Sequence, residues 1–450
     1  MKTTENVMGT KKITPLLLSM SIPPMISMMI QALYNIVDSI FVARLSPDAL
    51  TAVSLAFPLQ NLVLAVAVGF GVGLNACIAR RLGAKNQKAT DEAATHGFIF
   101  TAIHALIFVF IGLFFTKPFI RMFTNNEEIF NMACSYSYIV ITCAFGSLFH
   151  LFVEKIFQAT GDMLIPMLVQ GLGAIINIIL DPILIFGLFG FPKLGVAGAA
   201  IATVTAQIIA CLTSFILFFY KNNGVHVKFK NFKFNMQTIK SLYSVAIPSS
   251  IMIALPSALV GILNGILVGL SDFGVGVFGA YYKLQTFIYM PASGVIQGMR
   301  PIISFNYGAK NYKRMKETVK SALKITVTIM FFGTLLFLAV PTQIMSLFNN
   351  EPEILKTGSA ALRIISLGFI VSSIAVVLSG AFEALGKGMD SLIVSSIRLL
   401  LVIPPLAFIL SRFMGIYGVW AAFPIAEILA SIVAIYLYKK ISKDIYKQKF

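Results

Sequence analysis

Charged residues are scarce in this chain of 450 residues. They make up 12% of it, whereas apolar types make up 58%, and the mean hydropathy is +0.87. Soluble domains have about a quarter of their residues charged and about half apolar. The composition therefore excludes an ordinary soluble protein and predicts a chain that lies largely within a lipid bilayer.

Cysteine and histidine are also scarce, with four of each. The cysteines are interpreted as small buried apolar residues, because they lie in apolar segments without the spacing of metal ligands. The sequence has no glycine-rich phosphate loop, no nucleophile elbow and no metal-binding motif. These absences argue against ATP as an energy source within the chain and against an intramembrane enzyme, and no cofactor is expected.

Long apolar runs are abundant, and each is long enough to cross a hydrocarbon core of about 30 Å. No small-residue cleavage site follows the first lysines, so a removable signal peptide is not expected. The runs predict twelve transmembrane helices, near residues 15–43, 49–79, 93–116, 130–155, 163–189, 194–219, 241–270, 274–305, 318–342, 355–382, 390–412 and 416–438.

The second half of the chain repeats the first at an offset of 225 residues. The segment LGAKN at Leu82–Asn86 returns as YGAKN at Tyr307–Asn311. Many other residues recur at the same offset, among them Ile22-Pro23 with Ile247-Pro248, Gly69 with Gly294, Lys88 with Lys313, and Phe157 with Phe382. A duplicated bundle is the architecture of alternating-access transporters.

The predicted fold class is an all-α integral membrane protein of two six-helix repeats. Six is an even number, so both repeats enter the membrane from the same side and are parallel, related by an axis along the membrane normal. We expect a V-shaped, two-lobe bundle with an N-lobe over residues 1–220, a basic linker over 221–240 and a C-lobe over 241–450.

The excess of basic residues lies on one side of this predicted topology. Of the 35 Lys and Arg, 23 fall in the termini and even-numbered loops and six on the opposite side. The bias places both termini in the cytoplasm and predicts a plasma-membrane protein. The basic loops are interpreted as topology and anionic-lipid contacts rather than as a nucleic-acid site, since no base-reading element accompanies them.

Five acids fall within apolar spans, where a charge is costly unless it is paired or neutralised. They are Asp38, Glu154, Asp181, Glu383 and Glu427. For four of the five, and for Asn177, the other half carries a non-acidic residue at the equivalent position: Leu263 for Asp38, Leu406 for Asp181, Val402 for Asn177, Ser379 for Glu154 and Gln158 for Glu383. The acids therefore lie where the halves differ, which predicts a functional role and a different task for each lobe.

Two of these acids have amides on the same helix face. Tyr34 and Asn35 lie one turn before Asp38, and Asn177 lies one turn before Asp181, which Pro182 follows. Proline cannot donate to the carbonyl group one turn back, which leaves a free acceptor and predicts a kink. Two carboxyls, two amides and a free carbonyl suit a shared proton or a sodium ion, and burial favours the neutral form of a carboxyl.

The other three acids are secondary candidates, for which simple pairing is the alternative. Glu154 stands beside Lys155 near the end of a span. Lys283, Arg300 and Arg398 are possible partners for Glu383 and Glu427 in the second lobe.

Several motifs resemble the multidrug and toxic compound extrusion (MATE) family over nearly the whole chain. They are Tyr34-Asn35-x-x-Asp38, the Gly-Ala-Lys loops at 83–85 and 308–310, Gln158-Ala159-x-Gly161, Asn177–Pro182 and Gly195–Ala200. The resemblance is to the prokaryotic branch with its acids in the N-lobe. It implies export of amphipathic, often cationic, compounds in exchange for protons or sodium.

The resemblance also implies an ion site formed by Asp38, Asn177 and Asp181, which would be metal ligands only with sodium as the coupling ion. A sixth-helix threonine joins the site in some members, and Thr203 is the nearest match. Small drug-like compounds and membrane lipids are the expected partners, and a monomer suffices. The alternatives are a flippase for a lipid-linked saccharide, which would need a cationic cavity, and a channel, which the unequal halves disfavour.

Overall fold

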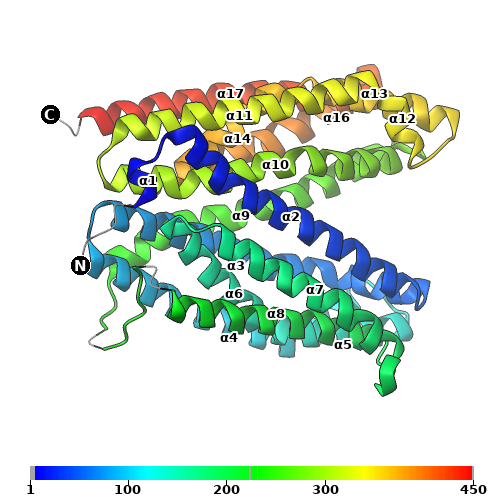
Figure 1. Ribbon diagram of the computed structural model, residues 1–450. Helices are drawn as coiled ribbons and strands as arrows, with labels where there is room; N and C mark the ends of the chain where they lie inside the picture. The colour runs from blue at the N-terminus through cyan, green and yellow to red at the C-terminus, as the bar shows by residue number, and fades with distance from the viewer. Residues whose placement is uncertain (1–5, 222–223, 231, 448–450) are drawn as a thin grey trace. The chain divides into compact units, whose positions relative to one another are not determined.

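The computed structural model describes residues 6–221, 224–230 and 232–447, and all regular structure in these ranges is helical. The first half contains α1 (Val7–Thr10), α2 (Ile13–Ala43), α3 (Pro47–Gly83), α4 (Gln87–Arg121), α5 (Glu127–Thr142), α6 (Phe145–Thr160), α7 (Leu164–Phe186), η1 (Leu188–Gly190) and α8 (Val196–Tyr220) (Figure 1). The second half contains α9 (Met236–Val268), α10 (Gly274–Gly308), α11 (Tyr312–Ala339), α12 (Pro341–Ser346), α13 (Pro352–Ser366), α14 (Phe369–Ala384), α15 (Gly388–Ser396), η2 (Ile397–Val402), α16 (Ile403–Met414) and α17 (Ile416–Lys447).

The twelve predicted spans are present, but two of them are broken. Within the described residues, nine helices are long and apolar enough to cross a membrane by themselves. Two more spans are bent pairs, α5 with α6 at 41° and α13 with α14 at 51°. The 35-residue α10 is the twelfth. The sequence pattern of 130–155 and 355–382 predicts one helix each, because apolar composition does not reveal a break in the backbone.

The two halves repeat each other in structure as in sequence. Both breaks lie at matching places, and the repeated pentapeptide forms the same turn twice. Lys85 and Lys310 both have a left-handed backbone, with φ of 55° and 56°. The next residue in each copy, Asn86 or Asn311, accepts a hydrogen bond from a backbone N–H of the following helix.

Close contacts separate the molecule into two units that differ from the two halves of the sequence. Unit 1 contains Ile26–Ser250, with Asn6 and Val7; unit 2 contains Met8–Met25 and the described residues from Ile251 onward. The first helix of each half, α2 or α9, is therefore divided between units, and the two division points are 225 residues apart. The division at 221–240 remains a prediction about the halves of the sequence.

Paired glycines allow these exchanged segments to pack closely. A Cβ at Gly73 of α3 would lie 2.4 Å from the carbonyl oxygen of Leu242, within unit 1. A Cβ at Gly298, the equivalent residue of α10, would lie 2.7 Å from the carbonyl oxygen of Met20, within unit 2. Backbone cannot yield as a flexible side chain can, so both positions require glycine.

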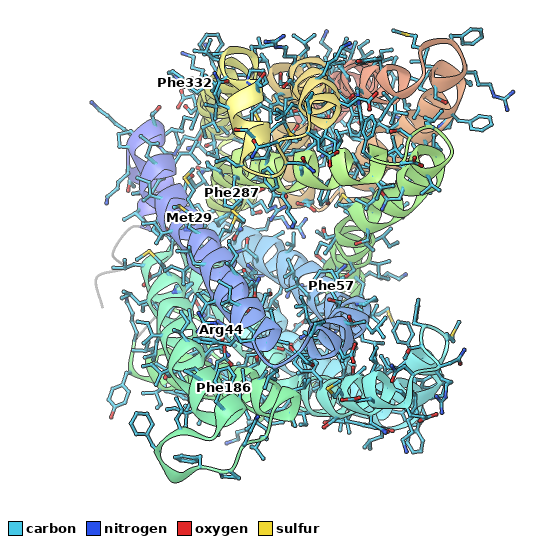
Figure 2. The ribbon with its side chains drawn as sticks, turned by 90° about the vertical axis from the view of Figure 1, so that its right-hand side faces the viewer. Met29, Arg44, Phe57, Phe186, Phe287 and Phe332 are labelled. Atoms are coloured by element: carbon cyan, nitrogen blue, oxygen red, sulfur yellow. The ribbon has the colours of Figure 1, made fainter. Side chains whose placement is uncertain are left out.

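The surface of each unit is apolar along its helices. Met29 and Phe57 in unit 1 are 58% and 63% exposed, and Phe287 and Phe332 in unit 2 are 58% and 62% exposed (Figure 2). Exposed apolar surface of this extent is typical of a membrane-embedded protein.

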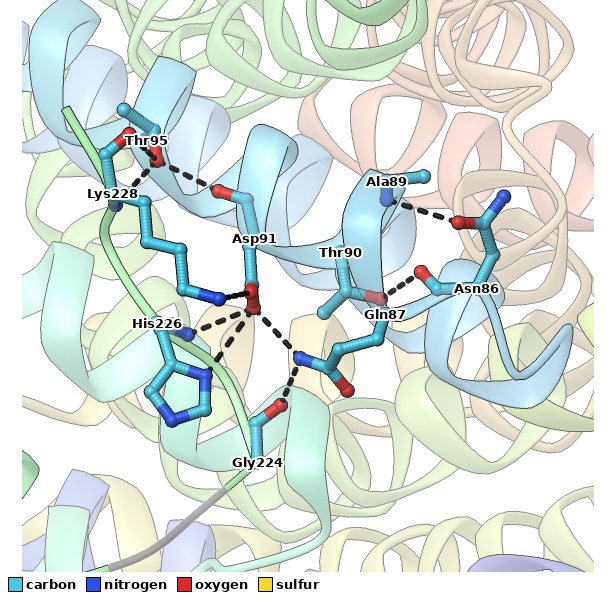
Figure 3. A network of polar contacts seen from close by, with 9 residues as sticks. All are labelled: Asn86, Gln87, Ala89, Thr90, Asp91, Thr95, Gly224, His226 and Lys228. Carbon is cyan, nitrogen blue, oxygen red and sulfur yellow. Dashed lines mark hydrogen bonds and ion pairs between the residues drawn. The ribbon is translucent and has the colours of Figure 1, made fainter. Parts of the chain in front are cut away.

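The segment between α8 and α9 is fastened to α4 within unit 1. The Asp91 carboxylate accepts hydrogen bonds from the side chain of Gln87 at 2.7 Å, the backbone N–H of His226 at 3.1 Å and Nζ of Lys228 at 2.7 Å (Figure 3). Thr95 exchanges hydrogen bonds with the backbone of Lys228. The basic linker therefore lies at the same end of unit 1 as the α3–α4 turn.

Candidate functional site

The predicted residues on α7 and α8 lie together in unit 1. Asp181 and Asn177 of α7 are 0% and 3% exposed, and Thr203 of α8 faces them. Nδ2 of Asn177 donates to Oδ1 of Asp181 at 3.3 Å and to Oγ1 of Thr203 at 3.4 Å. The amide thus connects the buried acid to the neighbouring helix.

Asp38 of α2 completes this cluster. Its carboxyl group and that of Asp181 are close enough to form a hydrogen bond. A hydrogen bond between two carboxyl groups requires that one of them carries a proton, because two carboxylates offer only acceptors. The two acids are therefore arranged to share a proton when no other cation lies between them.

The cluster has unused acceptor atoms. Oδ1 of Asp38, Oδ2 of Asp181 and Oδ1 of Asn177 are buried and have no hydrogen-bond partner among the residues that the structure describes. Buried polar atoms normally have a partner, so these three oxygens require one from outside the protein. Oxygen acceptors fit a hydrated proton or a hard cation such as sodium.

Two aromatic residues border the acids. Tyr34, predicted from its place one turn before Asp38, and Tyr136 of α5 both interact electrostatically with Asp38 and Asp181. The hydroxyl of Tyr136, which is 2% exposed, accepts a hydrogen bond from Nε2 of Gln60 at 3.1 Å. The sequence analysis missed Tyr136, although its equivalent in the second half is Ala361 and the same test of unequal halves would have found it.

Two details of the predicted site differ from expectation. The side chain of Asn35 is exposed and makes no hydrogen bond within the described part of the chain, since a residue three positions before Asp38 on α2 need not point inward with it. α7 continues as one helix through Pro182. The kink beside Asp181 therefore remains a prediction.

Glu154, a secondary candidate, is neutralised on its own helix. Its Oε1 lies 2.7 Å from Nζ of Lys155 and accepts a hydrogen bond from Nε2 of Gln158 at 2.8 Å. His150 lies one turn back, 4.0 Å from the other carboxylate oxygen. The pairing alternative from the sequence describes this acid, and it lies outside the Asp38 cluster.

The acids of unit 2 are paired with arginines, one tightly and one loosely. Glu383 lies 2.5 Å from Nη2 of Arg300, and Oε1 of Glu427 lies 3.5 Å from Nε of Arg398. Lys283, the third possible partner, is exposed and forms no ion pair with a described acid. Arg300 and Glu383 are equivalent to Asn75 and Gln158 in unit 1, where α3 and α6 also meet through polar contacts.

Comparison with known proteins gives the same two-fold pattern. The MatE family model matches residues 23–183 and again residues 248–409, and the two matches begin 225 residues apart. This chain belongs to the MatE family. The predicted family is confirmed, and the protein is a multi-pass membrane transporter.

Relatives of this MatE protein carry two kinds of name. It is 27% identical to a protein named FAD transporter from Shewanella oneidensis, over 95% of each chain. It is also 27% identical to the multidrug export protein MepA of Staphylococcus haemolyticus, over 93% of this chain and 91% of that one.

A solved structure has the same fold. A multidrug resistance MATE family transporter in an outward-facing conformation matches 99% of this chain and 100% of its own, with a TM-score of 0.92 and 27% identity. The two-lobe, twelve-helix fold class predicted from the sequence is confirmed.

Proposed function

We propose that this MatE transporter exports small amphipathic, often cationic, compounds in exchange for protons or sodium ions. The observation that supports this proposal is the carboxyl pair of Asp38 and Asp181, with three buried oxygens that lack partners among the described residues. Such a site has a reason to take up and release a cation, whereas a purely structural pair would be satisfied.

The coupling ion would act on unit 1. With a proton or sodium ion bound, Asp38 and Asp181 attract each other through it, and α2 and α7 are drawn together. Without it, the two negative charges repel in a medium of low polarity and the helices separate. We propose that this alternation bends the N-lobe helices, with the loaded state favouring release of the compound outward and the unloaded state favouring inward opening.

The available driving force is sufficient for drug export. One elementary charge that moves down a membrane potential of about 100 mV releases about 2.3 kcal/mol. At one ion for each exported molecule, this free energy supports an accumulation of about fifty-fold. We further propose that the protein acts as a monomer in the plasma membrane with both termini in the cytoplasm, which the clustering of basic residues supports.

A nucleotide-like substrate is a second candidate. The relative from Shewanella oneidensis is named FAD transporter, and the match covers 95% of both chains. An accessible arginine within the membrane-spanning part of unit 2 favours a substrate with a negative group.

Transport in proteoliposomes tests the proposal. We expect ethidium movement under an imposed pH gradient or an imposed sodium gradient, and its loss in Asp38→Asn. Asp272→Asn is the matched control, because it makes the same chemical change at an exposed loop residue. Folded protein that moves ethidium under neither gradient would overturn the proposal in favour of lipid-linked substrates, and full transport by Asp38→Asn would remove the ion site from unit 1.

A further inference from the structure

Arg398 occupies an unusual backbone segment in unit 2. It belongs to η2 (Ile397–Val402), a π-helical stretch between α15 and α16 within one membrane span. π-Helical turns are rare and occur frequently at functional sites, because the extra residue redirects a side chain that an α-helix would place elsewhere. Here the redirected residue is the only arginine of its span outside the last turn.

The ion pair of Arg398 is loose. Nε of Arg398 and Oε1 of Glu427 are 3.5 Å apart, whereas Nη2 of Arg300 and Oε2 of Glu383 are 2.5 Å apart in the same unit. Nε of Arg398 and Oε2 of Glu427 make no hydrogen bond with any residue in the described ranges. The terminal nitrogens of Arg398 also lack one there, and the side chain is 19% exposed. The planar fork of donors is therefore accessible and unused.

The groups around this arginine are mostly further donors. The hydroxyl of Tyr281 and the ring N–H of Trp420 are buried without a partner in the part of the chain that the structure describes. Both side chains are 0% exposed. Tyr281 interacts electrostatically with Arg398 and Glu427, and the ring of Tyr289 lies 6.0 Å from the guanidinium carbon. The surroundings offer hydrogen bonds and an aromatic face to a bound group with negative charge.

Packing of the bundle does not require these charges. The equivalents of Arg398 and Glu427 in unit 1 are Gly173 and Ala202, which fill the same places with small apolar groups. Gly368, at the break between α13 and α14, leaves room for the acid: a Cβ there would lie 3.3 Å from Cγ of Glu427. A buried charge in a membrane span is costly and is typically functional.

We propose that Arg398 is an oxyanion subsite of unit 2, which holds a carboxylate or phosphate group of an amphipathic compound. Glu427 is its internal counter-ion and is displaced by the ligand. Arginine recognises such groups through two parallel N–H donors, which its terminal nitrogens retain here. The inference deepens the proposed function, because it assumes that small amphipathic compounds are the cargo. The same chemistry would also take the headgroup of an anionic lipid.

Binding of two dyes that share one ring system tests this subsite. Fluorescein is anionic at mildly alkaline pH, whereas a rhodamine methyl ester is cationic and has the same xanthene ring. Fluorescence anisotropy would measure both affinities with purified full-length protein in nanodiscs of phosphatidylcholine. We expect Arg398→Gln to weaken fluorescein binding by about tenfold or more and to change rhodamine binding by less than about twofold.

Glu427→Gln separates a binding role from a structural one. Removal of the internal competitor should strengthen fluorescein binding by several-fold, whereas a damaged fold would weaken it. Arg300→Gln is the matched control, since it removes an arginine of similar exposure from a tight pair, and it should leave fluorescein binding within about twofold of wild type. Should Arg398→Gln not fold, Glu427→Gln by itself still decides.

The outcomes separate the possible ligands. Unchanged fluorescein affinity in Arg398→Gln, or weaker binding in Glu427→Gln, overturns the subsite. Loss of fluorescein binding when phosphatidylglycerol replaces half of the lipid, with no such competition in Arg398→Gln, supports the subsite and assigns it to the lipid headgroup. These readouts require no ion gradient, so their failure is distinguishable from failure of the Asp38 transport test.

Discussion

The last two spans of each half form equivalent surfaces with opposite chemistry. In unit 1, α7 and α8 present Asn177, Asp181 and Thr203, whose free atoms are acceptors. In unit 2, η2 and α17 present Arg398 and Glu427 beside Tyr281, where most free atoms are donors. Duplication supplied two copies of one scaffold, and substitution at a few internal positions made one copy suited to cations and the other to anions.

The parts that carry the fold changed much less. Gly73 and Gly298 occupy equivalent positions and each permits close backbone approach of an exchanged helix segment. The breaks at α5–α6 and α13–α14 also match. The difference between scaffold and site is therefore physical: close packing tolerates almost no substitution, whereas an internal polar position can change its charge if a partner changes with it.

The largest effect is expected at the shared scaffold. Gly73→Ala and Gly298→Ala should each destabilise the protein by about 3 kcal/mol, because the new Cβ would meet backbone atoms at 2.4 and 2.7 Å. Gly276→Ala is the control, with no atom within 4 Å of its Cβ, and should be neutral or slightly stabilising. Thermal unfolding in detergent measures the three variants. Equal stability would show that the exchanged segments do not hold the units together.

The next effect is expected at the acceptor site of unit 1. Asp181→Asn should reduce ion-driven ethidium transport at least tenfold, because an amide can neither share nor release the proton. Glu154→Gln is informative beside it: loss of the Lys155 pair should lower stability by about 3 kcal/mol without removing coupling in the protein that remains folded. Transport per folded molecule in proteoliposomes measures both, and equal loss in the two variants would contradict a special role for Asp181.

A sharper form of the comparison exchanges the driving force and the cargo. Arg398→Gln should leave gradient-driven ethidium export within about twofold of wild type, because a cation has no use for a guanidinium group. Asp38→Asn should abolish the same transport. Initial efflux rates at saturating ethidium measure the contrast, and a parallel loss in both variants would show that the two units share one site.

The smallest effect is expected at the linker. Lys228→Gln should cost about 1 kcal/mol or less, since its side chain is 62% exposed and Asp91 keeps its hydrogen bonds from Gln87 and His226. Thermal unfolding at low and high salt measures it, and the difference from wild type should shrink as salt rises. A large, salt-independent loss would mean that the linker supports unit 1 more than these contacts indicate.

Prediction from the sequence succeeded where the signal was regular and failed where it depended on neighbours. Asp38, Asn177 and Asp181 were found because an acid in an apolar run is costly wherever the helix lies. Tyr136 and Gln60 were missed, because a tyrosine and a glutamine are unremarkable until another helix is known to lie beside them. For the same reason the sequence named three partners for the acids of the second half but could not choose among them.

The sequence by itself determined the solvent, the twelve helices and the duplication, because hydropathy and repetition are properties of the chain alone. Tertiary structure decided which polar groups are satisfied. It tied Glu154 to Lys155, left the fork of Arg398 open, and brought together Asp38 and Asp181, which are far apart along the chain. The physical reason is that apolar burial is read locally, whereas a hydrogen bond or an ion pair exists only when folding brings both partners within reach.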